Sequence, residues 1–299
     1  MDESSMTTMA RTALRERLRT VAQLLSQTVK SKCERVEDTH ELRVATRRAD
    51  AALRLFRDWL PRRRQHQMQG ALRKIRAVAG AVRDLDVHRE RLLSTSCSSS
   101  QRSSTWLLDQ LDAQRRAEQK ALVRRWRGAS RDRLQKQIRA LVRRLHWRGV
   151  GDEPTSQQLA AQAVRLLTAR FEEALNTLDA GPSECHLARI RGRRVRYTLE
   201  LLGTVFPPGA AEAICEQLKH VQDRLGQVND DATALRHVQE WLSECHDASL
   251  RPSLHAMVVR AESAVTKRLA ALEQDGVLRN KAHDLVARLH ELQLMSIGT

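Results

Sequence analysis

Two histidines, each followed by arginines at helical spacing, are the residues of this chain best suited to bind a ligand. His40, Arg43, Val44, Arg47, Arg48, Leu53 and Leu55 recur as His186, Arg189, Ile190, Arg193, Arg194, Leu199 and Leu201, at a constant offset of 146 residues. A second block, Leu72, Ile75, Gly80, Val82 and Asp84, returns at the same offset as Leu218, Val221, Gly226, Val228 and Asp230. A hydrophobic core explains the repeated apolar residues, whereas the repeated histidine and arginines indicate a shared ligand. The chain is therefore predicted to contain two copies of one unit.

The basic residues of each copy form a narrow stripe along one helix. At about 100° per residue, Arg43, Arg47 and Arg54 all lie within about 60° of His40, and an apolar face lies opposite. The corresponding stripe of the second copy consists of His186, Arg189, Arg193 and Arg196, with Tyr197 beside it. Each helix is therefore expected to pack with one side and to bind with the other.

The stripe predicts an anionic partner. Like charges at i, i+4 destabilise a helix by a few tenths of a kcal/mol per pair, and an anion would offset that repulsion. Guanidinium groups are planar forks that match phosphate oxygens, and a histidine gains charge beside an anion. A chain of phosphates would satisfy several of these residues together. The alternative is a solvated face whose charges pair with Asp and Glu on neighbouring helices.

The second repeated block is expected to extend this anion surface. Arg73 corresponds to Lys219 and Arg83 to Asn229, so the basic character is partly kept. We expect Arg73, Arg83 and Lys219 to contribute cations, although ordinary surface charge is the alternative interpretation.

The residues that both copies of that block share are expected to have structural roles. Asp84 and Asp230 are expected to orient arginines of the neighbouring histidine-bearing helices. Gly80 and Gly226 are expected to allow close contact between helices, with ordinary helix packing as the alternative.

The remaining pattern predicts an all-α protein. Nearly every long segment has apolar residues at i, i+3, i+4 and i+7 and is rich in strong helix formers, and no segment predicts a strand. Helix breaks are expected at Pro61, the serine run 94–104, Gly128, residues 149–156, Gly181-Pro182, Pro207 to Gly209, Pro252 and Gly276. These breaks suggest two bundles of about four helices, near residues 8–148 and 154–297, related by a pseudo-two-fold axis with a cleft between them.

Composition favours a polyanionic partner. Lys and Arg total 52 against 36 Asp and Glu, for a net charge of +16 and a pI of about 10.8. Residues 1–150 contain 35 basic and 16 acidic residues, so the excess lies in the first half. Nine aromatic residues without clusters disfavour base stacking. The five scattered cysteines predict neither disulfides nor a zinc site. Without a signal peptide or a membrane span, we expect a cytoplasmic protein.

The residues around the two histidines resemble a known family. The segments His40-Glu-Leu-Arg-Val-Ala-Thr-Arg-Arg, Gly80-Ala-Val-Arg-Asp-Leu-Asp-Val87 and His186-Leu-Ala-Arg-Ile-Arg-Gly-Arg-Arg-Val-Arg-Tyr-Thr-Leu-Glu200 are similar to the CHAD family, the conserved histidine α-helical domain. The resemblance extends from about residue 10 to 295, so we expect one CHAD domain over residues 1–299. It implies two four-helix bundles about a pseudo-two-fold axis, a basic groove or pore between them, and specific, non-enzymatic binding of inorganic polyphosphate.

The family motif also implies which residues bind. They are His40, Arg43, Arg47, Arg48 and Arg54 in the first copy, and His186, Arg189, Arg193, Arg194, Arg196, Tyr197 and Lys219 in the second. Arg73 and Arg83 are added to this set because they lie in the second repeated block, which is expected to extend the anion surface. No cofactor, metal or catalytic residue is expected, and polyphosphate-containing granules are a further expected partner. Glu200 stands where the first copy has Arg54, so weaker binding is expected in the second copy.

Three other functions remain open from the residues. Nonspecific nucleic-acid binding needs only phosphate neutralisation and is the main alternative. A phosphohydrolase or kinase would use His40 or His186 as a nucleophile, but the repeated positions lack carboxylates to hold magnesium and no Gly-rich phosphate loop is present. Metal binding at Cys185-His186 or Cys245-His246 is disfavoured, because adjacent helix residues point about 100° apart.

Overall fold

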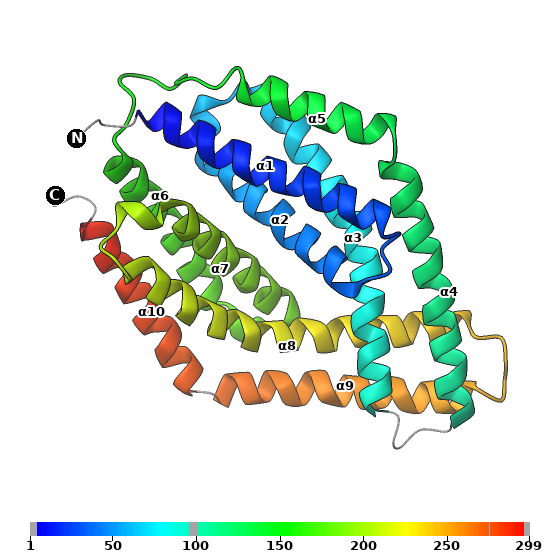
Figure 1. Ribbon diagram of the computed structural model, residues 1–299. Coiled ribbons are helices and arrows are strands. Elements are labelled where there is room, and N and C mark those ends of the chain that lie inside the picture. Colours follow the sequence, from blue (N-terminus) through cyan, green and yellow to red (C-terminus); the bar gives the residue numbers. More distant parts are fainter. Residues whose placement is uncertain (1–4, 96–100, 275, 296–299) are drawn as a thin grey trace. The chain divides into compact units, whose positions relative to one another are not determined.

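The protein folds into α-helices that form two compact units. A computed structural model describes residues 5–95, 101–274 and 276–295, and its contacts divide the chain into unit 1, Met1–Glu153, and unit 2, Pro154–Thr299. No strand occurs among the described residues (Figure 1). The all-α class predicted from the sequence is confirmed.

Unit 1 contains five α-helices and one short 3-10 helix. Their bounds are α1 Met6–Lys30, α2 Val36–Leu55, η1 Arg57–Trp59, α3 Arg62–Thr95, α4 Gln101–Trp126 and α5 Ala129–Val142. The histidine-bearing helix α2 packs between α1 and α3, while α4 packs against α3 and α5 packs mainly against α1. The stripe of α2 is thus positioned beside α3.

Unit 2 contains five α-helices and two short 3-10 helices among its described residues. It contains α6 Ser156–Leu175, η2 Leu178–Ala180, α7 Pro182–Leu202, η3 Gly203–Val205, α8 Ala210–Glu244, α9 Arg251–Gln274 and α10 Gly276–Met295. The second histidine-bearing helix, α7, packs between α6 and α8, and α9 follows α8. The residues of the repeated blocks that lie on α2 and α3 in unit 1 lie on α7 and α8 in unit 2.

Each unit has five α-helices among its described residues, where four were expected. In unit 1 the additional break separates α1 from α2 at residues 31–35, a stretch without Gly or Pro. Lys32 and Cys33 adopt positive φ angles of 51° and 58° there. Residues other than Gly, Asn and Asp seldom do so, which is why sequence pattern did not predict this turn.

The other expected breaks occur, although the serine-rich connection is shorter than expected. Gly128, Gly181 and Gly209 each precede a helix and have positive φ angles of 57°, 135° and 81°. Helix α3 continues to Thr95 and α4 begins at Gln101, so helices occupy much of the segment expected as a loop at residues 94–104. Residues 96–100 lie outside the described part of the chain.

Thr155 caps the N-terminus of α6, the first helix of unit 2. Its side chain accepts a hydrogen bond from the backbone N–H of Gln158, and the side chain of Gln158 accepts one from the backbone N–H of Thr155. This reciprocal capping box satisfies two amide donors at the N-terminus of α6.

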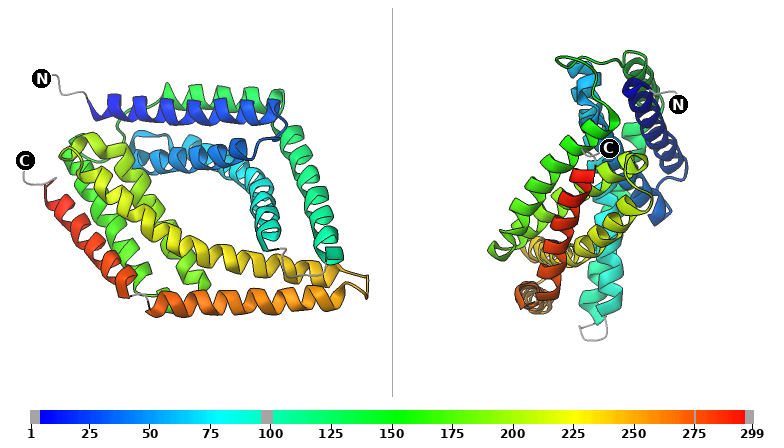
Figure 2. Two further views of the ribbon diagram at one scale, coloured as in Figure 1. Left: turned by 60° about the horizontal axis from the view of Figure 1, so that its bottom comes forward. Right: turned by 90° about the vertical axis from the view of Figure 1, so that its left-hand side faces the viewer.

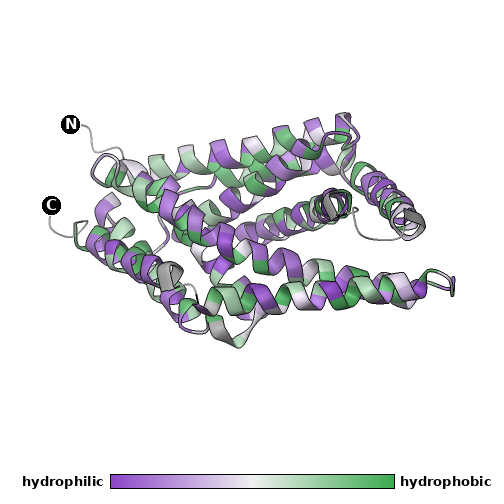
Figure 3. Ribbon diagram, turned by 90° about the horizontal axis from the view of Figure 1, so that it is seen from below, coloured by the Kyte–Doolittle hydropathy of each residue, from purple (hydrophilic) through white to green (hydrophobic). Residues whose placement is uncertain are grey.

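Hydrophilic and hydrophobic residues alternate along the helices, as expected for amphipathic segments (Figure 3). On α2 the buried residues include Leu42, Ala45, Ala49, Ala52 and Leu53, which lie on the side opposite the histidine. The predicted division of this helix into a packing side and a polar side is confirmed.

Gly192 in α7 is expected to be required for packing, although a glycine inside a helix normally lowers stability. A Cβ atom at this position would lie 3.0 Å from Cε2 of Phe171, whose side chain is fully buried. Alanine improves helix propensity by about 1 kcal/mol, but overpacking costs about 1–3 kcal/mol, so we expect Gly192→Ala to be destabilising. Urea unfolding followed by circular dichroism measures the change.

Gly70 in α3 is the matched control. A Cβ atom there meets no atom within 4 Å, so Gly70→Ala is expected to stabilise by about 0.5–1 kcal/mol. Stabilisation by both substitutions would contradict the packing role of Gly192.

Candidate anion-binding faces

The turn before α2 fixes where the first histidine stands. Asp38, in the first turn of α2, is buried and accepts a hydrogen bond of 2.6 Å from the Ser31 hydroxyl. The next buried residue, Thr39, donates to the carbonyl of Val36 at 2.9 Å. An acidic residue near a helix N-terminus is also favoured by the helix dipole. These contacts leave His40 exposed on the side of α2 away from the core.

Three arginines surround His40. Partial desolvation of its ring lowers the pKa of His40 below its ordinary value, and the positive charges of Arg83, Arg47 and Arg43 lower it further. Arg83 belongs to α3 and the other two belong to α2, so two helices bring these cations together. The stripe and its predicted extension to Arg83 therefore form one basic surface in unit 1.

Arg43 is held in place by α3. Its Nη1 donates to the carbonyl of Gly80 at 3.1 Å and to Oδ1 of Asp84 at 2.7 Å. A Cβ atom at Gly80 would lie 3.5 Å from the same nitrogen. The predicted orienting role of Asp84 is confirmed. Gly80 is buried beneath the guanidinium, so the group that approaches it closely is an arginine side chain.

Arg76 is a member of this surface that sequence reasoning missed. Burial lowers its pKa; Asp50 acts in the opposite direction, and the charges of Arg54, Arg73 and Arg43 lower the pKa further. The signal was present in the sequence, since Arg76 lies three residues after Arg73 on one side of α3. Its counterpart at the 146-residue offset is Gln222, so Arg76 is not one of the repeated cations.

We call this surface of unit 1 the α2–α3 face. It comprises His40, Arg43, Arg47 and Arg54 on α2 and Arg73, Arg76 and Arg83 on α3. Arg54 is partly neutralised by Asp50, because its Nε lies 3.2 Å from Oδ2 of that residue. The face nevertheless keeps a strong excess of positive charge.

In unit 2 the same positions are arranged differently. Nδ1 of His186 is hydrogen-bonded to Oδ1 of Asn229, the residue that replaces Arg83. A Cβ atom at Gly226 would lie 3.2 Å from Nε of Arg189, so the arginine again covers the glycine. Among the described residues, this buried Nε has no hydrogen-bond partner, and no bond joins Arg189 to Asp230. The orienting role predicted for Asp230 is not seen there.

Arg196 contacts two neighbours on its own helix. Its Cζ lies 5.0 Å from the ring centroid of Tyr197, and its Nη2 lies 3.4 Å from the phenol oxygen. Its Nε is 4.0 Å from Oε1 of Glu200. Tyr197 is only 4% exposed, so its side chain supports Arg196 more than it meets solvent.

We call the unit 2 surface the α7–α8 face. It comprises His186, Arg189, Arg193 and Arg196 on α7 and Lys219 on α8. Lys219 is exposed, and Arg193 is half-buried. Where the α2–α3 face has Arg54, Arg76 and Arg83, unit 2 has Glu200, Gln222 and Asn229, and the α7–α8 face carries four Arg and Lys residues against six.

Two predicted residues lie away from these stripes. Arg48 is about 80° around α2 from His40, and Arg194 has the same offset from His186 on α7. Both are half-buried and both interact with other groups. Their binding roles stay predictions from the family motif.

A buried ion pair fixes the turn that precedes His40. Nε of Arg115 on α4 lies 2.5 Å from Oδ1 of Asp86 on α3. Arg115 and Gln119 also donate to the carbonyl of Cys33, at 3.3 and 2.8 Å. Burial raises the pKa of the Cys33 thiol to about 11, so this cysteine is not a nucleophile at neutral pH. These contacts hold the start of α2 against α3 and α4.

The described residue ranges give no support for a metal site or a membrane-spanning helix. No group of three or more His, Cys, Asp or Glu residues there could hold a metal ion. No helix within those ranges is long and apolar enough to cross a membrane. Cys97, one of the five cysteines considered as ligands, lies outside them.

Comparisons with known proteins identify the family. The fold is similar to the crystal structure of the CHAD domain from the plant Ricinus communis, with a TM-score of 0.70 and 20% identity over 96% of this chain and 92% of that one. It is also similar to PptA from Streptomyces chartreusis, with a TM-score of 0.69 and 16% identity over 90% of this chain and 98% of that one. A search of curated proteins found no match. The sequence model of the CHAD domain matches residues 12–239, and this chain therefore belongs to the CHAD domain family.

Proposed function

We propose that this protein binds inorganic polyphosphate without catalysis, through the α2–α3 face and the α7–α8 face. The observation that carries the proposal is that Arg43 and Arg47 of α2 and Arg83 of α3 all act on the charge of His40. Repulsion among these groups is offset when an anion binds between them. Charge-assisted hydrogen bonds and counterion release then supply affinity. Membership of the CHAD family supports the same conclusion.

A bare phosphate chain fits these faces better than a nucleic acid. Neither face presents an aromatic ring on which a base could stack, because the ring of Tyr197 is buried. Phosphate oxygens can accept bidentate hydrogen bonds from guanidinium groups along the whole chain. Nucleic acid remains the alternative ligand, since its backbone carries the same charge.

Competition between anions tests the proposal. A labelled long-chain polyphosphate is titrated with the protein at about 0.15 M salt, and duplex DNA and RNA are added as competitors. We expect polyphosphate to stay bound in excess nucleic acid and its affinity to fall steeply with salt. Equal displacement by DNA or RNA would assign the faces to nonspecific nucleic-acid binding instead.

We expect the protein to bind polyphosphate without cleaving it or transferring its phosphoryl groups. Hydrolysis or transfer of phosphoryl groups needs a metal held by carboxylates, and at the α2–α3 face Asp50 and Asp84 are each paired with an arginine. We expect the length of polyphosphate to be unchanged on a gel after incubation with the protein and Mg²⁺. Shortening of the chain would contradict a purely binding role.

Binding is expected to strengthen as pH falls, because His40 takes up a proton when polyphosphate binds. The free protein holds the pKa of His40 below its ordinary value, and an anion raises it again. Protonation therefore favours the complex over the window that begins near pH 6.5, the ordinary value for histidine, and extends below it. The same lowered pKa makes the unbound fold less stable on acidification, since the unfolded chain binds the proton more tightly.

Dissociation constants at about pH 5.5 and pH 7.5 measure this effect. We expect His40→Gln to lose much of the pH dependence, and His255→Gln, at an exposed position on α9, to keep it. Equal pH dependence in both variants would show that His40 takes no part.

A further inference from the structure

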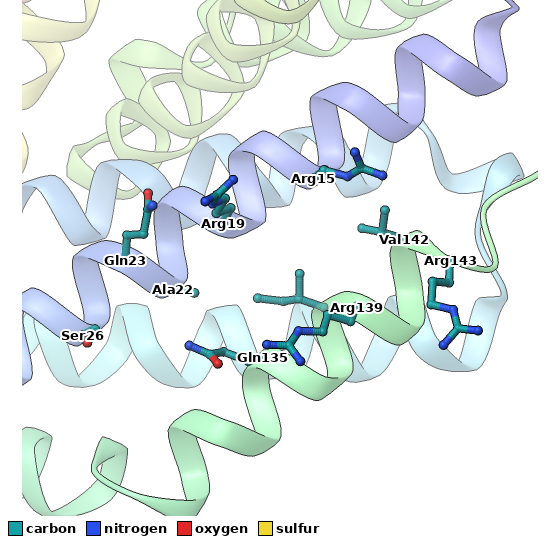
Figure 4. A pocket seen from close by; sticks show the side chains of 10 residues that line it. Arg15, Arg19, Ala22, Gln23, Ser26, Gln135, Arg139, Val142 and Arg143 are labelled. Atoms are coloured by element: carbon teal, nitrogen blue, oxygen red, sulfur yellow. The ribbon is translucent and has the colours of Figure 1, made fainter.

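A groove outside the two binding faces runs between α1 and α5 of unit 1. The two helices lie side by side (Figures 1 and 2), and the groove between them has a volume of about 640 Å³. Arg15 and Arg19 of α1, Arg139 of α5 and Arg143, which directly follows α5, line it (Figure 4). None of the residues of the α2–α3 face contributes to this lining.

The four arginines present unneutralised charge. All are exposed, and no side-chain hydrogen bond or ion pair is found for any of them within the described part of the chain. Elsewhere in unit 1, by contrast, Asp84, Asp86 and Asp112 each pair with an arginine of another helix. The groove therefore has two basic edges that repel each other and favour an acidic occupant.

The lining between these edges combines three aliphatic side chains with the polar side chains of Gln23, Ser26 and Gln135. Ala22 of α1 and Ile138 and Val142 of α5 lie there, and their side chains are 6–9% exposed. From Arg15 to Ser26 the groove follows α1 for about 16 Å, which is three helical turns. An occupant must therefore offer apolar groups along its middle and acidic groups on its flanks.

We infer that the α1–α5 groove docks an acidic amphipathic helix of a partner protein. Leucine-like side chains at i, i+3, i+4 and i+7 would pack on Ala22, Ile138 and Val142, and flanking Asp and Glu would pair with the arginines. Polyphosphate gains nothing from the aliphatic part of the lining, and one fatty acid brings a single charge to four arginines. A second copy of this chain is disfavoured because both copies carry +16.

A peptide of defined pattern tests the docking. The probe is a labelled peptide of about 18 residues with leucines along one helical face and glutamates beside them. A peptide of the same composition with its leucines dispersed is the control for patterning. Anisotropy at about 0.15 M salt measures binding to the full chain. We expect the patterned peptide to bind and the dispersed peptide to bind at least about 10-fold more weakly.

Two double variants separate the groove from general surface charge. Arg139→Glu with Arg143→Glu reverses one edge of the groove and should weaken peptide binding by about 10-fold or more. Lys136→Glu with Arg144→Glu changes the net charge equally at exposed positions outside the groove, and should alter binding by less than about 3-fold. Circular dichroism establishes that both variants are folded.

Several outcomes would overturn the inference. Equal losses in the two double variants, equal binding of the two peptides, or no binding of either peptide would leave no specific helix site. Variant-sensitive binding of dodecyl phosphate without peptide binding would assign the groove to small amphiphiles. Loss of polyphosphate affinity in the groove variant alone would make the groove part of the polyphosphate surface. The proposed function itself is tested separately, because it depends on other residues.

Discussion

Replacing Arg76 by glutamine and Arg83 by asparagine is expected to weaken polyphosphate binding by about 100-fold or more. These substitutions give the α2–α3 face the residues that stand at the matched positions of the α7–α8 face. Each removes a cation beside His40 or Arg43, and a charge-assisted hydrogen bond contributes about 1.5–3 kcal/mol. The dependence of log affinity on log salt should also become shallower by about 1–2. Titration at several salt concentrations measures both quantities.

The control for this prediction removes two cations elsewhere in unit 1. Lys136→Gln with Arg144→Asn changes exposed residues outside both faces and is expected to lower affinity by less than about 3-fold. The reciprocal change, Asn229→Arg in unit 2, should tighten binding by adding the missing cation and releasing His186. Equal effects of the control and the paired substitutions would mean that net charge, and not the α2–α3 face, determines affinity.

Replacing Asp86 by alanine is expected to destabilise the protein by about 3–5 kcal/mol. Asp86 is 7% exposed and bonded to Arg115, so its removal leaves a largely buried guanidinium without its counter-charge. Arg115 also holds the carbonyl of Cys33, and its displacement would loosen the turn that positions α2. Urea unfolding gives the loss of stability, and polyphosphate titration of the folded variant shows whether the α2–α3 face is disturbed.

Two further variants distinguish the ion pair from general effects of charge. Asp58→Ala removes a surface partner of Arg57, at 3.4 Å and half exposed, and should cost less than about 1 kcal/mol. Asp86→Leu with Arg115→Met replaces the pair by apolar groups and should recover most of the stability, because Gln119 still donates to Cys33. A small loss in Asp86→Ala would show that the pair is not structural.

Unit 2 contains a comparable ion pair between its long helix α8 and the next helix, α9, at a position shifted by one residue. Nε of Arg268 on α9 lies 3.1 Å from Oδ2 of Asp231 on α8, and Asp231 is 4% exposed. Asp231 corresponds at the 146-residue offset to Leu85, the neighbour of Asp86. A buried carboxylate thus joins the long helix to the next one in both units, although the two positions differ by one residue.

Local sequence periodicity was sufficient to predict much of the fold. Apolar spacing of 3.6 residues and helix-forming composition depend on near neighbours, so the all-α class and the apolar side of α2 followed from the sequence alone. Glycine and proline likewise indicated most helix boundaries. The turn at Lys32 and Cys33 was missed because residues of this type rarely adopt positive φ, and here Arg115 and Gln119, more than 80 residues away, hold it.

The internal repeat predicted which helix face carries the candidate site. Only the tertiary contacts showed which residues belong to that site and how they are paired. Repeated cations identified the stripe on α2, because repetition exposes a requirement beyond core packing. Only the packing of α2 against α3 showed that Arg43 is paired with Asp84 over Gly80, and that Arg76 belongs to the face. Such pairings join residues about 20–40 positions apart, and their strength depends on burial, which no spacing in the sequence specifies.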